Sequence, residues 1–131
     1  MIFQLLSFLL LLLVPAMASA AEFDDESFCN VMMEQQKKIN ADAGQMVDAV
    51  TRNDGVAVLC STKIIDFKKF MASDSSKMRE GWQDRKAKQW NEIYCNGVFL
   101  DAINNGWTVA FTLIFQDGNR FWYKANCDSS N

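Results

Sequence analysis

The sequence has 131 residues, of which 50% are hydrophobic and 22% are charged, and its formal net charge is −3. This acidic balance argues against nucleic acid as a ligand. The chain contains no histidine, which excludes a Ser-His-Asp triad, a Cys-His nucleophile and every imidazole metal site. We therefore predict neither a metal site nor a cofactor.

Residues 1–20 have the pattern of a secretory signal peptide. The apolar run from Phe8 to Val14 is too short to cross a bilayer. Pro15 breaks this run, and the small residues Ala18-Ser19-Ala20-Ala21 then offer a cleavage site after Ala20 or, one place further on, after Ala21. The segment departs from the usual pattern because no Lys or Arg precedes the apolar run. We expect residues 1–20 to be removed and residues 21–131 to form a single exported domain without a transmembrane anchor. The periplasm of a Gram-negative bacterium is the favoured location, and secretion is the alternative.

The exported part begins with a predicted helix. Asp24 and Asp25 precede apolar residues at helical spacing, so they supply a cap and an acidic first turn. Gly44 can end this helix. Within it, Met32 and Met33 are predicted to fill the core.

Three strand-like runs follow this helix. Residues 46–52 and 56–60 are rich in apolar and β-branched side chains and flank Asn53-Asp54-Gly55, which predicts a hairpin with its turn at that tripeptide. Residues 64–70 predict a further strand of the same sheet, although so short an apolar run also fits a helix.

The second half begins with a long helical pattern after a polar break at residues 73–76. The pattern reaches Tyr94, breaks at Asn96-Gly97, continues to Ile103 and ends at Asn104-Asn105-Gly106. Two β-rich runs, 107–115 and 121–127, then flank a turn at residues 116–119 and predict a β-hairpin.

The predicted elements together give an α+β fold in the order α-β-β-α-α-β-β with an antiparallel sheet. Trp107 and Trp122, on the two strands of the last hairpin, are predicted to pack in the core or across the strands.

The four cysteines predict two disulfides, because an even number in an exported chain is typical of oxidised pairs. Zinc is disfavoured because the spacing lacks a C-x-x-C pair and histidine is absent. Each half of the chain runs from Cys-Asn through a helix to an Asp-Gly turn and a closing cysteine, which indicates a weak repeat of two helix-plus-hairpin halves. This repeat favours pairing Cys29 with Cys60 and Cys95 with Cys127, while the other connectivities remain open.

A group of aromatic and basic residues in the middle helix is the candidate binding site. Trp82, Lys86 and Trp90 are spaced i, i+4, i+8, with Arg79 on the same side. Two indoles beside an ammonium group could stack on a sugar or hold an anion. In the alternative interpretation, both indoles face the core and the Lys86 side chain extends along them to solvent.

Glu80 and Asp84 are the weaker, catalytic alternative. Their i, i+4 spacing could place two carboxylates on one helical face, as a glycosidase requires. Basic neighbours at helical spacing favour surface salt bridges instead.

The sequence therefore favours a small, exported, non-enzymatic binding or accessory protein. Its partner would be a protein, or an anionic or glycan ligand. Acidic residues dominate positions 22–54 and basic residues dominate positions 63–90, and this separation of charge could steer an anionic partner. Two alternatives remain: a small carboxylate-dependent hydrolase that acts on polysaccharide, and a membrane-surface or structural envelope protein.

Overall fold

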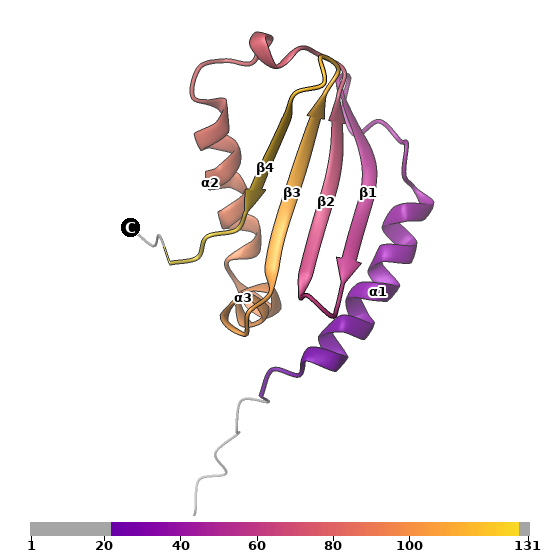
Figure 1. Ribbon diagram of the computed structural model, residues 1–131, viewed down its shortest axis with the longest axis vertical. Helices are drawn as coiled ribbons and strands as arrows, with labels where there is room; N and C mark the ends of the chain where they lie inside the picture. The colour runs from indigo at the N-terminus through magenta and orange to yellow at the C-terminus, as the bar shows by residue number, and fades with distance from the viewer. Residues whose placement is uncertain (1–21, 129–131) are drawn as a thin grey trace, which may run out of the picture.

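The computed structural model describes residues 22–128, and the predicted signal peptide lies outside this range. Helices and strands follow one another along the chain in the order α-β-β-α-α-β-β (Figure 1). The predicted α+β class and this order are confirmed. The elements are α1 (Asp25–Ala41), β1 (Thr51–Leu59), β2 (Ile64–Met71), a short 3₁₀ helix (Ser75–Lys77), α2 (Trp82–Tyr94), α3 (Gly97–Asn104), β3 (Thr108–Phe115) and β4 (Arg120–Lys124).

The four strands form one sheet in the order β1-β2-β3-β4. β1 and β2 are antiparallel, as are β3 and β4, but the central strands β2 and β3 run parallel. The sheet is therefore mixed, whereas the sequence predicted an antiparallel one. The difference arises because α2 and α3 form a long crossover that returns the chain to the same end of the sheet.

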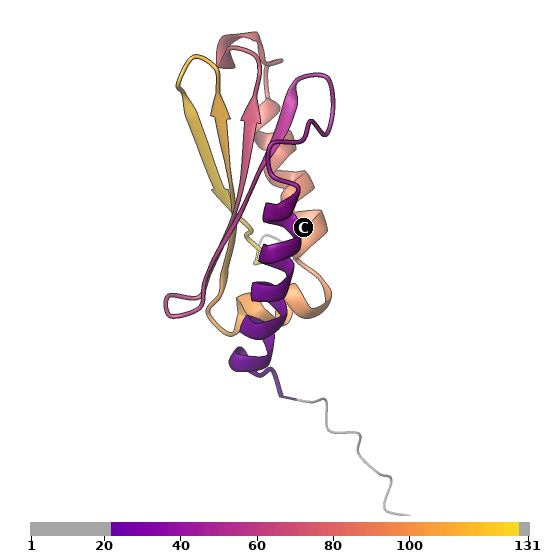
Figure 2. The ribbon, with the colours of Figure 1, turned by 90° about the vertical axis from the view of Figure 1, so that its right-hand side faces the viewer.

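The helices all lie on one face of the sheet, as the side view shows (Figure 2). Alternate residues of each strand point toward this face because side chains in a strand alternate between its two sides. In β3 these residues are Val109, Phe111, Leu113 and Phe115, all buried. They form the core with Phe28 and Met32 of α1, Trp90 of α2, and Trp107.

The first predicted hairpin is wrong in position. Asn53-Asp54-Gly55 is not a turn but a bulge inside the continuous strand β1, where the register with β2 shifts between Asn53 and Val56. The side chain of Asn40, at the end of α1, pairs with this bulge: its amide nitrogen donates to the Val56 carbonyl at 3.1 Å and its oxygen accepts from the Val56 N–H at 2.8 Å. A partner distant in sequence therefore supplies the hydrogen bonds that a local turn pattern would have used.

The turn that joins the first two strands lies at residues 60–63 instead. Lys63 has a φ of 55° there. Residues 46–50 form no strand of their own, and Met46 makes only an isolated bridge to Arg52.

The other predicted boundaries agree with the structure to different degrees. Asp24 caps α1 as predicted, since its carboxylate accepts from the Glu26 N–H at 3.1 Å. α2 begins only at Trp82, because the preceding polar segment forms the 3₁₀ helix. The break between α2 and α3 and the final hairpin lie where the sequence placed them.

Two disulfides join Cys29 to Cys60 and Cys95 to Cys127, the pairs that the repeat favoured. The halves nevertheless differ in topology. Cys60 follows the first strand of its hairpin, whereas Cys127 follows the second. In addition, β1 and β3 run in opposite directions. The similarity of the halves is therefore one of element order and not of spatial arrangement.

Candidate functional site

The two tryptophans of the predicted binding group belong to the core. Trp90 is 7% exposed, and its indole N–H donates to the Val109 carbonyl at 3.0 Å. The half-buried Trp82 contacts Phe115 and Phe121 edge to face, with ring centroids 5.4 and 4.9 Å apart. A pair of exposed indoles, as a sugar platform would need, is absent from this part of α2.

The rest of the predicted group borders a basic groove along α2. Arg79, Lys86 and one side of Trp82 line this open hollow of about 640 Å³, together with Lys77, Arg85 and Lys88. Arg85 is held in place because its guanidinium donates to the Glu80 carbonyl at 2.7 Å. The basic groove concentrates positive charge, but its surface is wide open to solvent.

The carboxylates of Glu80 and Asp84 do not share a helical face, because Glu80 precedes the start of α2. Both residues are exposed and border a shallow hollow formed by residues 78–84 alone. A glycosidase acid is normally held in an apolar pocket. The geometry gives the hydrolase alternative no support.

Of two other pairs of residues that the sequence predicted to pack inside the protein, one member is buried and the other is exposed. Met32 is buried, but Met33 is 37% exposed. Trp107 is buried just before β3, whereas Trp122 is 54% exposed on the sheet face without helices, where it lies opposite Thr112. Trp107 and Trp122 therefore do not pack across the hairpin.

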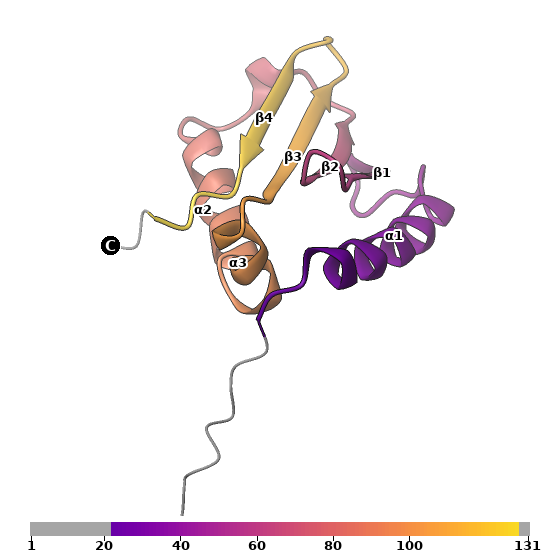
Figure 3. The ribbon, with the colours of Figure 1, turned by 60° about the horizontal axis from the view of Figure 1, so that its bottom comes forward.

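A hollow larger than the basic groove is an apolar cleft between α1 and the α2–α3 pair. Figure 3 shows these helices side by side on the same sheet face, with α1 apart from the other two. The interhelical cleft between them has a volume of about 850 Å³. It is lined by Phe28, Val31, Met32, Gln35 and Ile39 of α1, Phe67 of β2, Ile93 and Tyr94 of α2, and Val98 and Phe99 of α3.

Aromatic contacts build the floor of the interhelical cleft. The centroid of the Tyr94 ring lies 5.6 Å from that of Phe67 and 4.9 Å from that of Phe99. The ring centroids of Phe99 and Phe28 are 6.0 Å apart. Burial raises the pKa of the Tyr94 phenol above its ordinary value, so the group stays neutral at physiological pH. The floor is therefore a packed, uncharged surface.

The walls of the interhelical cleft expose large aliphatic side chains. Val31 is 58% exposed on α1, and Ile93 and Val98 are each 54% exposed on the facing helices. Three exposed aliphatic side chains thus line one cleft, and exposed apolar surface in a hollow is typical of binding sites.

The two ends of the interhelical cleft have opposite charge. At one end, beside the starts of α1 and α3, the rim carries Glu22, Asp24 and Asp101. At the other end, a small pocket of about 70 Å³ adjoins the cleft at Ile93 and is lined by Lys69 and Lys86. We call these the acidic end and the lysine end.

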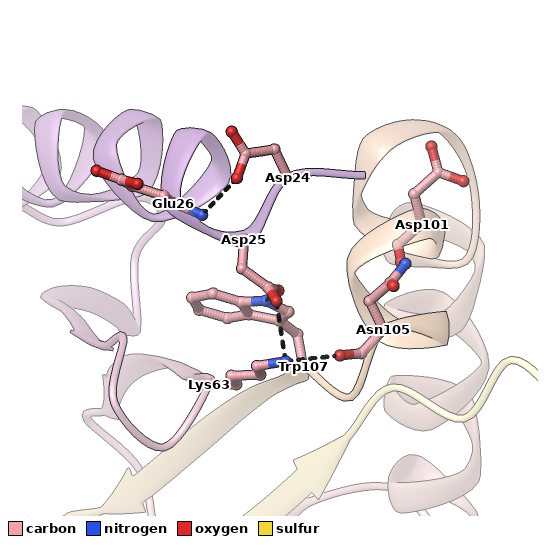
Figure 4. Close-up of polar contacts among 7 residues, drawn as sticks. All are labelled: Asp24, Asp25, Glu26, Lys63, Asp101, Asn105 and Trp107. Atoms are coloured by element: carbon pink, nitrogen blue, oxygen red, sulfur yellow. Dashed lines mark hydrogen bonds and ion pairs between the residues drawn. The ribbon is translucent and has the colours of Figure 1, made fainter. Parts of the chain in front are cut away.

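A polar latch holds α1 at the acidic end (Figure 4). The Trp107 indole N–H donates to the Asp25 carboxylate at 2.8 Å. The Lys63 ammonium lies 3.1 Å from the same carboxylate and donates to the Asn105 carbonyl at 3.1 Å. These contacts lower the pKa of Asp25. The latch fixes the α1 wall against two turns that are distant in sequence.

Sequence reasoning missed the interhelical cleft, although it predicted the first helix and apolar residues at helical spacing within it. The apolar pattern shows that a helix has a face to bury. It cannot show that part of this face, Val31, remains open because the neighbouring helices stand apart.

Comparison with solved structures finds a similar fold in a crystal structure of a "putative secreted protein" from Pseudomonas aeruginosa. The TM-score is 0.61, and the sequence identity is 10% over 80% of this chain and 94% of that one. At this identity the likeness shows a shared fold. No family model and no curated protein matches the chain. Across residues 22–128, no helix is long and apolar enough to cross a membrane, and no cluster of metal-binding side chains occurs.

Proposed function

We propose that this protein is an exported, non-enzymatic binding protein whose ligand occupies the interhelical cleft. The observation that carries the proposal is an open cleft of about 850 Å³ whose walls expose Val31, Ile93 and Val98 above a packed aromatic floor. Small-molecule sites are typically apolar hollows of about 300–1,000 Å³ with few polar groups.

Export is supported by three separate observations. Residues 1–20 have the pattern of a cleavable signal peptide. All four cysteines form disulfides, which persist in oxidising compartments. The structurally similar protein from Pseudomonas aeruginosa is itself described as a "putative secreted protein". We place the protein in the periplasm or outside the cell.

The proposal is tested with a neutral fluorescent probe, N-phenyl-1-naphthylamine, which becomes brighter in apolar surroundings. We expect the wild-type protein to bind it. V31E and V98E each place a charge on a wall of the cleft and should weaken binding at least tenfold, because a carboxylate is costly to desolvate. Both positions are more than half exposed, so folding should persist.

The matched control is V47E. Val47 is 59% exposed and lies in the loop between α1 and β1, outside the lining of the cleft. Its replacement should leave probe binding unchanged. The proposal fails if the wild-type protein does not bind the probe, or if V47E weakens binding as much as V31E does.

A further inference from the structure

Lys69 occupies an unusual position on the helix-covered face of the sheet. In β2 this face otherwise carries Ile65, Phe67 and Met71, since side chains alternate along a strand. Lys69 follows Phe67 by two residues, so its side chain continues the floor of the interhelical cleft about 7 Å further along the strand. A charged group is costly to desolvate at such a place unless it is paired, and groups in such surroundings are often found at functional sites.

Lys86 approaches the same place from α2. It precedes Ile93 by seven residues, which puts both side chains on one face of the helix. Lys69 and Lys86 together line the small pocket at the lysine end, whose other walls are the apolar side chains of Trp90, Phe111 and Leu113 and the amide of Gln89. The apolar cleft therefore ends at two neighbouring ammonium groups.

The lysine end has an excess of positive charge. Burial and the nearby Lys86 lower the pKa of Lys69, while Asp48 acts in the opposite direction. The Asp48 carboxylate already accepts from the Val50 and Thr51 N–H groups, at 2.9 and 2.7 Å. Within residues 22–128, neither lysine forms an ion pair with a carboxylate. Counted with Asp48 alone, the two lysines leave an excess of positive charge, and the basic groove that Lys86 also lines adds further positive charge beside it.

Building on the function proposed above, we propose that the interhelical cleft binds a long-chain carboxylate. Its head group lies between Lys69 and Lys86, and its hydrocarbon chain lies along the cleft toward the acidic end. A carboxylate head group is attracted by the positive charge at the lysine end, and its small size suits the small pocket there. The carboxylates of Glu22, Asp24 and Asp101 repel an anionic head at the opposite end, which fixes the direction of the ligand.

The first experiment measures displacement of N-phenyl-1-naphthylamine by three twelve-carbon amphiphiles below their micellar concentrations: dodecanoate, dodecanol and dodecyltrimethylammonium. Dodecanoate should bind at least tenfold more tightly than the other two at low salt. Among carboxylates, each two added methylenes should tighten binding by roughly ten- to fifteenfold while the chain still fits the cleft, because more apolar area is buried.

The second experiment assigns the head-group site. K69Q should weaken the binding of dodecanoate at least tenfold and leave the binding of dodecanol unchanged. K68Q is the matched control, because Lys68 is exposed on the opposite face of the same strand. K86Q gives an independent measurement if K69Q does not fold, since Lys86 lies at the helix surface.

The outcomes separate this proposal from the function on which it rests. If the wild-type protein does not bind the probe, both fail. If the probe binds but the three amphiphiles compete equally, or if K69Q and K86Q behave like K68Q, the cleft binds ligands but the carboxylate proposal is overturned. Dodecyl phosphate binding more tightly than dodecanoate overturns the monoanionic head group. Sedimentation that shows a dimer broken by V98E assigns the cleft to a second copy and also overturns the proposal.

Discussion

At the scale of single residues, contacts between distant positions hold α1 in place. Asp25 joins Trp107 and Lys63 at the start of the helix, and Asn40 pairs with the β1 bulge at its end. Each contact depends on one side chain whose partner is far away in sequence. The stability of the cleft wall should therefore respond to single substitutions.

The latch at Asp25 predicts a dependence on pH. The pKa of Asp25 is lowered in the folded state, first by the Trp107 hydrogen bond and then by Lys63. Its contribution to stability is therefore complete above the ordinary aspartate value of about 3.9 and is lost as the pH falls through the lower folded value. D25N should lower the melting temperature at pH 7. The difference from the wild type should shrink below about pH 4. A difference that stays constant down to pH 2 would show that the charge of Asp25 is irrelevant to the latch.

The bulge at Gly55 should not tolerate a larger residue. Its φ is +98°, and an added Cβ would collide with the side-chain oxygen of Asn40. G55A should therefore cost about 2–4 kcal/mol, since backbone strain adds to the loss of the Asn40 hydrogen bonds. Gly118 is the matched control, because its φ is +85° but nothing lies within 4 Å of the added atom. G118A should lower the free energy of unfolding by only about 1–2 kcal/mol. Urea unfolding of both variants measures the difference. Equal costs would contradict the close contact with Asn40.

At the scale of elements, the disulfides tie the two walls of the cleft to the sheet. Cys29 joins α1 to the end of β1, and Cys95 joins the α2–α3 junction to the segment after β4. α1 therefore keeps its position through the latch, the bulge contact and one covalent bond.

The disulfides predict nearly equal losses of stability. The sequence separations are 31 and 32 residues, so replacing either pair by alanine should cost about 3–4 kcal/mol in the chain-entropy description. Urea unfolding of C29A/C60A and C95A/C127A measures both values. If one double variant is as stable as the wild type, its disulfide contributes nothing to restricting the unfolded chain.

At the scale of the whole molecule, all helices lie on one face of the sheet (Figure 2). The interhelical cleft lies between α1 and the α2–α3 pair. Because α1 and α2–α3 pack on different strands, the sheet sets their separation. The opposite charges at the two ends of the cleft then come from segments distant in sequence: the start of α1 and α3 at one end, and β2 with α2 at the other.

Export predicts a defined mature protein. Mass spectrometry of the exported fraction should show a chain that begins at Ala21, after loss of residues 1–20. Thiol labelling in denaturant without reductant should modify no cysteine, because all four are paired. A retained N-terminal segment, or more than a trace of labelled thiol, would contradict this prediction.

The sequence by itself determined the α+β class, the element order, the final hairpin and the Asp24 cap, because these depend on periodicity and on residues close along the chain. The cysteine spacing also favoured the two pairs seen in the structure. Only the tertiary structure decided that Asn53-Asp54-Gly55 is a bulge, that β2 and β3 are parallel, and that Trp90 is buried while Val31 is open. The interhelical cleft belongs to this second group. Its size and charge depend on how far apart two helices stand on one sheet, and that distance is set by packing between residues remote in sequence.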